Sequence, residues 1–252
     1  MSLSFDLSGK VALVTGCSTG LGQGISLGLA EAGAEIVGVD YVDAPETEQK
    51  IQRLGRKFLG IKANLMSIDP LEGIIQQTLE KFGHIDILVN NAGIIRRQDA
   101  IEFSEENWDD VLNINLKTVF FLSQLTARQY IKQKTGGKII NVASMLSFQG
   151  GIRVPSYTAS KSAVMGITRA LANEWARDGI NVNAIAPGYM ATSNTAPLRA
   201  DTERSAAILD RIPAGRWGLP EDVQGPAVFL ASSASDYVNG YTIAVDGGWL
   251  AR

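Results

Sequence analysis

Short runs of apolar residues alternate along the chain with longer segments whose apolar positions recur every three or four residues. The short runs are typical of strands buried on both faces of a parallel sheet, and the longer segments are typical of amphipathic helices. Strands are predicted at residues 10–15, 35–40, 58–63, 85–89, 138–143, 180–186 and 241–245. Helices are predicted between them, at residues 25–33, 44–55, 70–82, 108–132, 157–175 and 220–230.

This alternation predicts an α/β fold, a doubly wound Rossmann-type parallel sheet of about seven strands with helices on both faces. No linker, repeat or low-complexity stretch interrupts it, so residues 1–252 are expected to form a single domain. Residues 189–218 are mixed and polar and carry several Arg, which is typical of a mobile lid over a site.

The amino-acid composition argues against several kinds of partner: nucleic acid, membrane and metal ions. A net charge of −3 argues against a nucleic-acid partner, which needs a basic surface. The single cysteine, Cys17, excludes an intrachain disulfide, and neither a signal peptide nor a membrane-length apolar run is present, so a cytoplasmic protein with no membrane partner is expected. One His and no clustered carboxylates leave no basis for a metal site, and His84 is interpreted as a turn residue.

A glycine-rich turn, Gly-Cys-Ser-Thr-Gly-Leu-Gly at residues 16–22, joins the first predicted strand to the first helix. Such a turn presents backbone N–H groups and a helix N-terminus to an anion, so it favours a pyrophosphate ligand. Its spacing differs from the common G-x-G-x-x-G pattern, and a turn without ligand is the alternative.

The second predicted strand ends on Asp40, about twenty residues past that turn. A carboxylate there accepts hydrogen bonds from both hydroxyls of an adenosine ribose and repels a 2′-phosphate. No Arg or Lys stands between residues 16 and 33 or immediately after Asp40 to bind such a phosphate. The sequence therefore predicts NAD rather than NADP as cofactor.

Tyr157 and Lys161 stand four residues apart at the start of a predicted helix, and so on one face of it. A phenol with a pKa near ~10 is a poor base at neutral pH, but an ammonium within ~4–6 Å favours the phenolate. Ser144 follows the predicted strand at 138–143, where its hydroxyl would hold a substrate oxygen. Taken alone, the Tyr–Lys pattern also fits an ordinary surface pair. Other residues of the chain are needed to distinguish a catalytic pair from a surface pair.

Asparagines occupy two further positions of interest. Asn90-Asn91-Ala92-Gly93 follows a predicted strand at the end where doubly wound sheets bind ligands, although a simple turn also fits. Asn115 interrupts the apolar face of the predicted helix at 108–132, where a buried amide without partners costs roughly 1–3 kcal/mol. Asn115 is therefore either a group that holds water or backbone near the site or a satisfied core asparagine.

Together these residues resemble the short-chain dehydrogenase/reductase family over essentially the whole chain. Its marks stand here as Thr15-Gly16-x-x-x-Gly20-x-Gly22, Asn90-Asn91-Ala92-Gly93, Asn115, Ser144, Tyr157-x-x-x-Lys161, and Pro187-Gly188 followed by Thr192. Any one of these motifs is weak, but six in this order are specific.

The resemblance implies roles for these positions. Tyr157 would be the general acid/base and Lys161 would lower its pKa and bind the nicotinamide ribose. Ser144 would bond the reacting oxygen, and Asn115 would hold a water in a proton relay. The implied cofactor contacts are Gly16, Ser18, Thr19, Gly20, Leu21, Gly22, Asp40, Asn64, Leu65, Asn91, Ala92, Gly93, Tyr157, Lys161, Pro187, Gly188, Met190 and Thr192.

Segments 91–97, 144–155 and 212–218 resemble family members that act on six-carbon sugar acids. A carboxylate is best bound by an Arg, and sugar hydroxyls by amides and hydroxyls. The expected substrate contacts are Ser144, Leu146, Gln149, Arg153, Tyr157 and Arg97. Another sugar-acid dehydrogenase, a reductase of acyl-carrier thioesters and a non-catalytic NAD-binding module are the alternatives.

Family members of this length are usually homotetramers, so the resemblance implies the same assembly. The apolar tail Trp249-Leu250-Ala251, which a monomer would have to expose, also suits burial against a partner.

Overall fold

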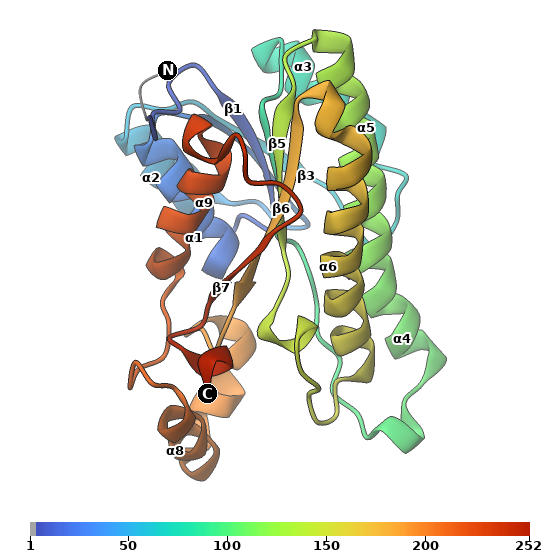
Figure 1. The fold of residues 1–252 in the computed structure, drawn as a ribbon, viewed down its shortest axis with the longest axis vertical. Coiled ribbons are helices and arrows are strands. Elements are labelled where there is room, and N and C mark those ends of the chain that lie inside the picture. The colour runs from blue at the N-terminus through green and yellow to red at the C-terminus, as the bar shows by residue number, and fades with distance from the viewer. Residues whose placement is uncertain (1–3) are drawn as a thin grey trace.

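The computed structural model describes residues 4–252 and contains a seven-stranded sheet in which every neighbouring pair of strands is parallel (Figure 1). The strands are β1 (Val11–Thr15), β2 (Glu35–Asp40), β3 (Phe58–Lys62), β4 (Ile87–Asn90), β5 (Gly137–Val142), β6 (Ile180–Pro187) and β7 (Thr242–Val245). Their order in space is β3-β2-β1-β4-β5-β6-β7, so the winding reverses between β1 and β4. This confirms the predicted doubly wound Rossmann-type fold, in which ligands bind beyond the carboxyl ends of the strands at the reversal.

Helices cover both faces of the sheet (Figure 1). They are α1 (Gly20–Glu31), α2 (Pro45–Arg53), α3 (Leu71–Phe82), α4 (Glu105–Leu112), α5 (Thr118–Gln133), α6 (Pro155–Trp175), α7 (Ala196–Ala200), α8 (Thr202–Arg211) and α9 (Gln224–Ala231). One core cluster joins the sheet to α1, α2 and α9, through side chains such as Leu29 and Leu230, and a second joins it to α3, α5 and α6, through Ile74 and Leu122. The central strands β1, β2, β4 and β6 are buried at nearly every position, which is why they read as short continuous apolar runs.

The helix predicted at residues 108–132 is divided in the structure. α4 begins after Ser104, whose Oγ accepts the backbone N–H of Asn107 at 3.2 Å, and it ends at Leu112. A π-helical turn, Asn113–Lys117, then connects it to α5. π-helical turns inside helices are rare and often mark functional positions, and this one contains Asn115.

The C-terminal tail corrects a second expectation. Trp249 is only 4% exposed, because it packs within its own chain against Met145, Ile208 and Ile212. Two glycines with positive φ, Gly247 at 65° and Gly248 at 90°, turn the chain back on itself just before it. A monomer therefore does not expose this indole, and the tail is no argument for an oligomer.

Residues 189–218, predicted as a lid, contain α7 and α8. α8 and the C-terminus lie at the same end of the molecule (Figure 1). Within residues 4–252, no helix is both long and apolar enough to cross a membrane, and the same residues include no group of three or more His, Cys, Asp or Glu arranged to hold a metal ion.

Candidate active site

The glycine-rich turn lies between β1 and α1, as predicted. Gly16 and Gly20 have φ values of 67° and 58°, in the left-handed region that favours glycine. At Gly22 a Cβ would overlap the Gly16 carbonyl oxygen, so only glycine fits there. The Asn91 side-chain N–H₂ donates to the carbonyls of Thr15 and Gly16, at 2.9 and 3.0 Å. Asn91 thus fixes the shape of the turn from the end of β4.

Asp40 lies directly beside this turn. Its Oδ2 accepts the backbone N–H of Ser18 at 3.0 Å, and its Oδ1 accepts the N–H of Tyr41 at 2.8 Å. The residue is 7% exposed, so the carboxylate is held in a fixed position at the end of β2. Thr19 is the extended residue that precedes α1, and Leu21 in the first turn packs against the core.

A cleft of about 430 Å³ opens next to Asp40. Asn64 and Leu65 from the segment after β3 line it. Asn64 Oδ1 accepts the N–H of Met66 at 3.0 Å, and the Leu65 carbonyl accepts the Thr118 hydroxyl at 2.9 Å, so both positions are fixed. The other lining residues include Gly16, Val39, Tyr41, Ala63, Ala92, Ile94 and Ile114. A cleft of this size with one polar edge suits a planar base and a ribose.

The segment that follows β6 closes over the glycine-rich turn. Pro187 is the last residue of β6, and Gly188 packs so closely against the segment after β7 that a Cβ would clash. Met190 is buried at 4% exposure. The Thr192 side chain lies within van der Waals distance of the Cβ position of Gly20. The predicted cofactor residues from β1, β2, β4 and β6 thus gather at one edge of the sheet.

Tyr157, Lys161 and Ser144 meet at the same edge. The Lys161 Nζ lies 5.7 Å from the centroid of the Tyr157 ring and donates to the Val142 carbonyl at 2.6 Å. The Ser144 hydroxyl lies close enough to the Tyr157 phenol to lower its pKa, and it accepts the backbone N–H of Leu146 at 3.1 Å. An alcohol or carbonyl oxygen between the serine and tyrosine hydroxyls would therefore meet two hydrogen-bonding groups at once.

Burial shifts the pKa of both ionisable groups here. It raises the pKa of the Tyr157 phenol above its usual value of 10.0, and the nearby Ser144 hydroxyl and the charge of Arg97 oppose this rise. Burial lowers the pKa of Lys161 from 10.5 to about 8. The expected fall in the tyrosine pKa under the influence of Lys161 is not what this structure gives, because desolvation of the phenolate outweighs the nearby charges.

Asn115 is fully buried and all three of its hydrogen bonds are made within the chain. Its Oδ1 accepts the N–H of Ile94 at 2.9 Å, and its Nδ2 donates to the Ile94 carbonyl at 3.0 Å and to Ser160 Oγ at 3.2 Å. A Cβ at Gly93 would lie 2.9 Å from the same Oδ1, which explains the glycine. Asn115 therefore ties the loop after β4 to α6, the helix that carries Tyr157.

The candidate arginines differ in their partners. Arg153, at φ 65°, forms an ion pair with Asp99 at 2.8 Å, and both side chains are more than half exposed. Arg97 donates to the Asn194 carbonyl in the predicted lid at 3.4 Å, and its charge acts on the phenol of Tyr157. Of these two arginines, Arg97 is therefore the one whose charge acts on Tyr157.

Gln149 and Leu146 lie on the loop that carries Ser144. The Gln149 Oε1 accepts the indole N–H of Trp249 at 3.2 Å. Leu146 is partly buried against the cluster that contains Trp249. This link to the C-terminus has no signal in the sequence.

Ser147 is a buried site residue that the sequence did not single out. Its hydroxyl donates to the Lys161 carbonyl at 2.6 Å, and its oxygen accepts the Ser144 N–H at 3.3 Å. It thereby joins the segment of Ser144 to the helix of Lys161. A second serine three residues after the strand-end serine is the signal that was available, since such spacing caps a short helical turn.

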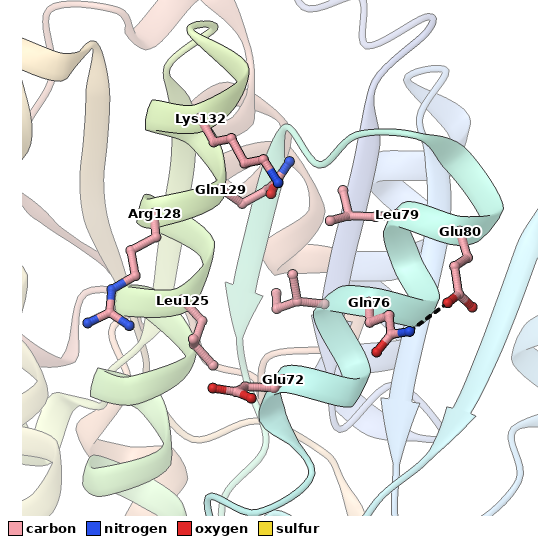
Figure 2. Close-up of a pocket in the computed structure, with 9 residues that line it drawn as sticks. Glu72, Gln76, Leu79, Glu80, Leu125, Arg128, Gln129 and Lys132 are labelled. Atoms are coloured by element: carbon pink, nitrogen blue, oxygen red, sulfur yellow. Dashed lines mark hydrogen bonds between the residues drawn. The ribbon is translucent and has the colours of Figure 1, made fainter.

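A hollow of about 530 Å³ lies between α3 and α5, away from these residues (Figure 2). An apolar floor that includes Leu79 and Leu125 is bordered by charged side chains such as Glu72 and Arg128, and none of the predicted site residues line it. The hollow is therefore not a candidate active site, although it is larger than the cleft beside Asp40.

The class of protein follows from the nucleotide-sized cleft and the buried hydroxyl–phenol–amine group at the reversal of a Rossmann-type sheet. It is an oxidoreductase that acts on a CH–OH group with a nicotinamide cofactor. The chain belongs to the short chain dehydrogenase family, whose model matches residues 10–203.

Known proteins resemble the chain over nearly its whole length. Two relatives are named 2-dehydro-3-deoxy-D-gluconate 5-dehydrogenase: one from Dickeya dadantii is 72% identical, covering 99% of this chain and 98% of its own length, and one from Escherichia coli K12 is 69% identical with the same coverage. A crystal structure of a putative 2-deoxy-D-gluconate 3-dehydrogenase from Agrobacterium tumefaciens, with bound NADP, is 54% identical, with a TM-score of 0.92 and full coverage of both chains. A putative NAD(P)-dependent gluconate 5-dehydrogenase from Beutenbergia cavernae is 47% identical, with a TM-score of 0.95, and covers 99% of this chain and 100% of its own.

Proposed function

We propose that this enzyme interconverts 2-dehydro-3-deoxy-D-gluconate and 3-deoxy-D-glycero-2,5-hexodiulosonate with NAD(H), in the breakdown of pectin and related uronate polymers. It would also oxidise 2-deoxy-D-gluconate at C3. The observation that carries the proposal is the Ser144 hydroxyl beside the Tyr157 phenol, with Lys161 buried next to them, in a chain 72% and 69% identical to two enzymes of that name.

In the proposed reaction the nicotinamide supplies the hydride acceptor for oxidation and the hydride donor for reduction. Tyr157 Oη takes the proton of the substrate hydroxyl during oxidation and returns it to the developing alkoxide during reduction. Ser144 Oγ donates a second hydrogen bond to that oxygen, which stabilises its negative charge. Lys161 adds positive charge beside the phenolate that forms, while Asn115 keeps the helix of Tyr157 aligned with the loop after β4.

Arg97 is the proposed partner of the substrate carboxylate, ahead of Arg153. A guanidinium that already forms an ion pair with Asp99 has less to gain from a second carboxylate, whereas Arg97 bonds only a backbone carbonyl among the described residues. Leu146 and Gln149 would complete the substrate site from the loop of Ser144. Residues 189–218 would act as its lid, within a single domain spanning residues 1–252.

NAD is the proposed cofactor, although the Agrobacterium relative holds NADP. A second cleft of about 440 Å³ adjoins Asp40 and is lined by two further acids, Asp43 and Glu48. Lys62 and Lys81 also line it, and Lys62 forms an ion pair with Asp43 at 3.8 Å. A 2′-phosphate on the ribose would meet the fixed Asp40 carboxylate, and this repulsion supports NAD.

The protein is further proposed to be a cytoplasmic homotetramer, on the family resemblance. Size-exclusion chromatography with light scattering tests the assembly, and a monomer would contradict it.

The substrate is tested by following NADH oxidation with three compounds: 3-deoxy-D-glycero-2,5-hexodiulosonate, 5-keto-D-gluconate and an acetoacetyl thioester. The proposal expects the highest kcat/KM for the first. A higher value for 5-keto-D-gluconate would support a gluconate 5-dehydrogenase, and a higher value for the thioester would support an acyl-carrier reductase. Absence of turnover with all three would support a non-catalytic NAD-binding module.

A further inference from the structure

The last turn of the chain, Trp249–Ala251, joins two parts of the substrate site that are far apart in sequence. Toward the catalytic loop, the Trp249 indole N–H donates to Gln149 Oε1 at 3.2 Å. Toward α8, the Arg211 guanidinium stacks on the Trp249 ring at 4.0 Å, and Arg252 donates to the Asp210 carbonyl at 2.8 Å. One indole thus contacts both the loop of Ser144 and the helix of the predicted lid.

The hydrogen bond to Trp249 also determines what Gln149 can offer a ligand. An indole N–H only donates, so the atom of the Gln149 amide that faces it must be the carbonyl oxygen. The other end of the amide is the N–H₂, which only donates. A carboxylate, carbonyl or hydroxyl oxygen of a sugar acid is the matching acceptor.

The contacts that Trp249 makes with Gln149 and with α8 belong to a buried cluster. Trp249 is 4% exposed and lies in a cluster with Met145 of the catalytic loop and with Ile208 and Ile212 of the lid. Tyr189, just after β6, packs edge-on against the same ring with centroids 4.8 Å apart. Loss of the indole N–H would therefore free the amide without exposing the site to solvent.

We propose that Trp249 is a positioning residue for substrate specificity. Its N–H holds Gln149 as a donor toward a substrate oxygen, and because its ring stacks on Arg211, the same hydrogen bond couples the lid helix α8 to the loop that carries Ser144. This inference rests on the proposed sugar-acid substrate.

Trp249→Phe tests it, because the ring and its stack on Arg211 remain while the N–H is lost. We expect the KM for the sugar acid to rise about tenfold, the upper range for one neutral hydrogen bond, with kcat and the Kd of NADH within about twofold of wild type. Trp217→Phe is the matched control. Trp217 lies in the same cluster and packs edge-on against Tyr189 at 5.5 Å, but Gln149 bonds the other indole. A KM for Trp249→Phe equal to that of the control would overturn the proposal.

Two variants of Gln149 separate the roles. Gln149→Met removes both interactions, so adding Trp249→Phe to it should leave the KM unchanged; effects that multiply would overturn the coupling. Gln149→Glu still accepts the indole N–H but presents an acceptor in place of the donor, so it should raise the KM while amide hydrogen exchange in α8 stays at the wild-type rate. A wild-type KM for Gln149→Glu would refute the donor role.

Amide hydrogen exchange also tests the link between α8 and the loop of Ser144, in the enzyme without cofactor or substrate. Amides of α8 should exchange faster in Trp249→Phe than in Trp217→Phe, and equal rates would refute the coupling of lid and loop. A wild-type enzyme that fails to turn over the sugar acid would overturn the proposed substrate, whereas normal wild-type turnover with an unchanged Trp249→Phe KM would overturn only this inference.

Discussion

Lys161 gives a quantitative test, because its ammonium is buried and its pKa is lowered from 10.5 to about 8. Below pH 8 the amine is protonated in both the folded and the unfolded chain, and the folded state carries the full cost of desolvating it. Between about 8 and 10.5 the unfolded chain binds more protons than the folded one, so the free energy of unfolding rises with pH. The lowering of the Lys161 pKa by roughly 2.5 reduces the free energy of unfolding by about 3 kcal/mol at low pH. About 2 kcal/mol of that stability is regained as the pH rises from 7 to 9.5.

Lys161→Met keeps the length of the side chain and removes the charge. The lost bond to the Val142 carbonyl costs the variant a constant amount, so only the slope with pH is informative. The difference in the free energy of unfolding, wild type minus variant, should rise by about 2 kcal/mol from pH 7 to 9.5. Urea unfolding at fixed protein and salt concentration measures it.

Lys132→Met is the control, since Lys132 is exposed on α5 and loses little hydration on folding. Its difference from wild type should stay flat over the same range. A flat difference for Lys161→Met as well would refute the reasoning, because the ammonium would then not be desolvated in the folded protein.

Three further substitutions probe the cofactor and proton sites. Asp40→Ala should lower the preference for NAD over NADP by about tenfold, measured as the ratio of kcat/KM values, since the fixed carboxylate is lost; an unchanged ratio would exclude the ribose contact. Gly22→Ala should abolish NADH binding in a fluorescence titration, because the added methyl overlaps the glycine-rich turn, whereas Gly73→Ala, with open space at its Cβ position, should bind normally; binding by Gly22→Ala would contradict the geometry. Ser144→Ala should move the acidic limb of the pH–rate profile for oxidation to higher pH, because the lost hydroxyl no longer lowers the pKa of Tyr157; a shift to lower pH would contradict that cause.

The strands were predictable from sequence because both faces of the central strands are buried, whereas their order in space was not predicted. Runs such as residues 11–15 are apolar at nearly every position, and they end at glycines and polar residues that mark the carboxyl edge. The positions of the glycine-rich turn, Asp40, Ser144 and the Tyr157–Lys161 pair follow from that edge. Their positions along the chain were therefore predictable, but their grouping into one site also rested on the resemblance to the short-chain dehydrogenase/reductase family.

Features that depend on distant partners were not predictable. The π-helical turn at Asn113–Lys117 accompanies three hydrogen bonds of Asn115, to Ile94 and Ser160, which lie on other segments. The direction of the Tyr157 pKa shift depends on how completely the phenol is buried, and spacing along a helix carries no such information. The return of Trp249 onto Gln149 requires the positive φ of two glycines and a gap between lid and loop that only the folded chain defines.

The central claim is that the Tyr157 hydroxyl moves the proton in a nicotinamide-dependent oxidation of a sugar acid. Formation of NADH from 2-dehydro-3-deoxy-D-gluconate and NAD, compared between wild type and Tyr157→Phe, tests it most directly, with the exposed Tyr237→Phe as control. The account predicts that kcat falls by roughly 10²–10⁴ in Tyr157→Phe while the Kd of NADH changes less than about twofold. Near wild-type turnover by Tyr157→Phe, with its hydroxyl gone, would contradict the account.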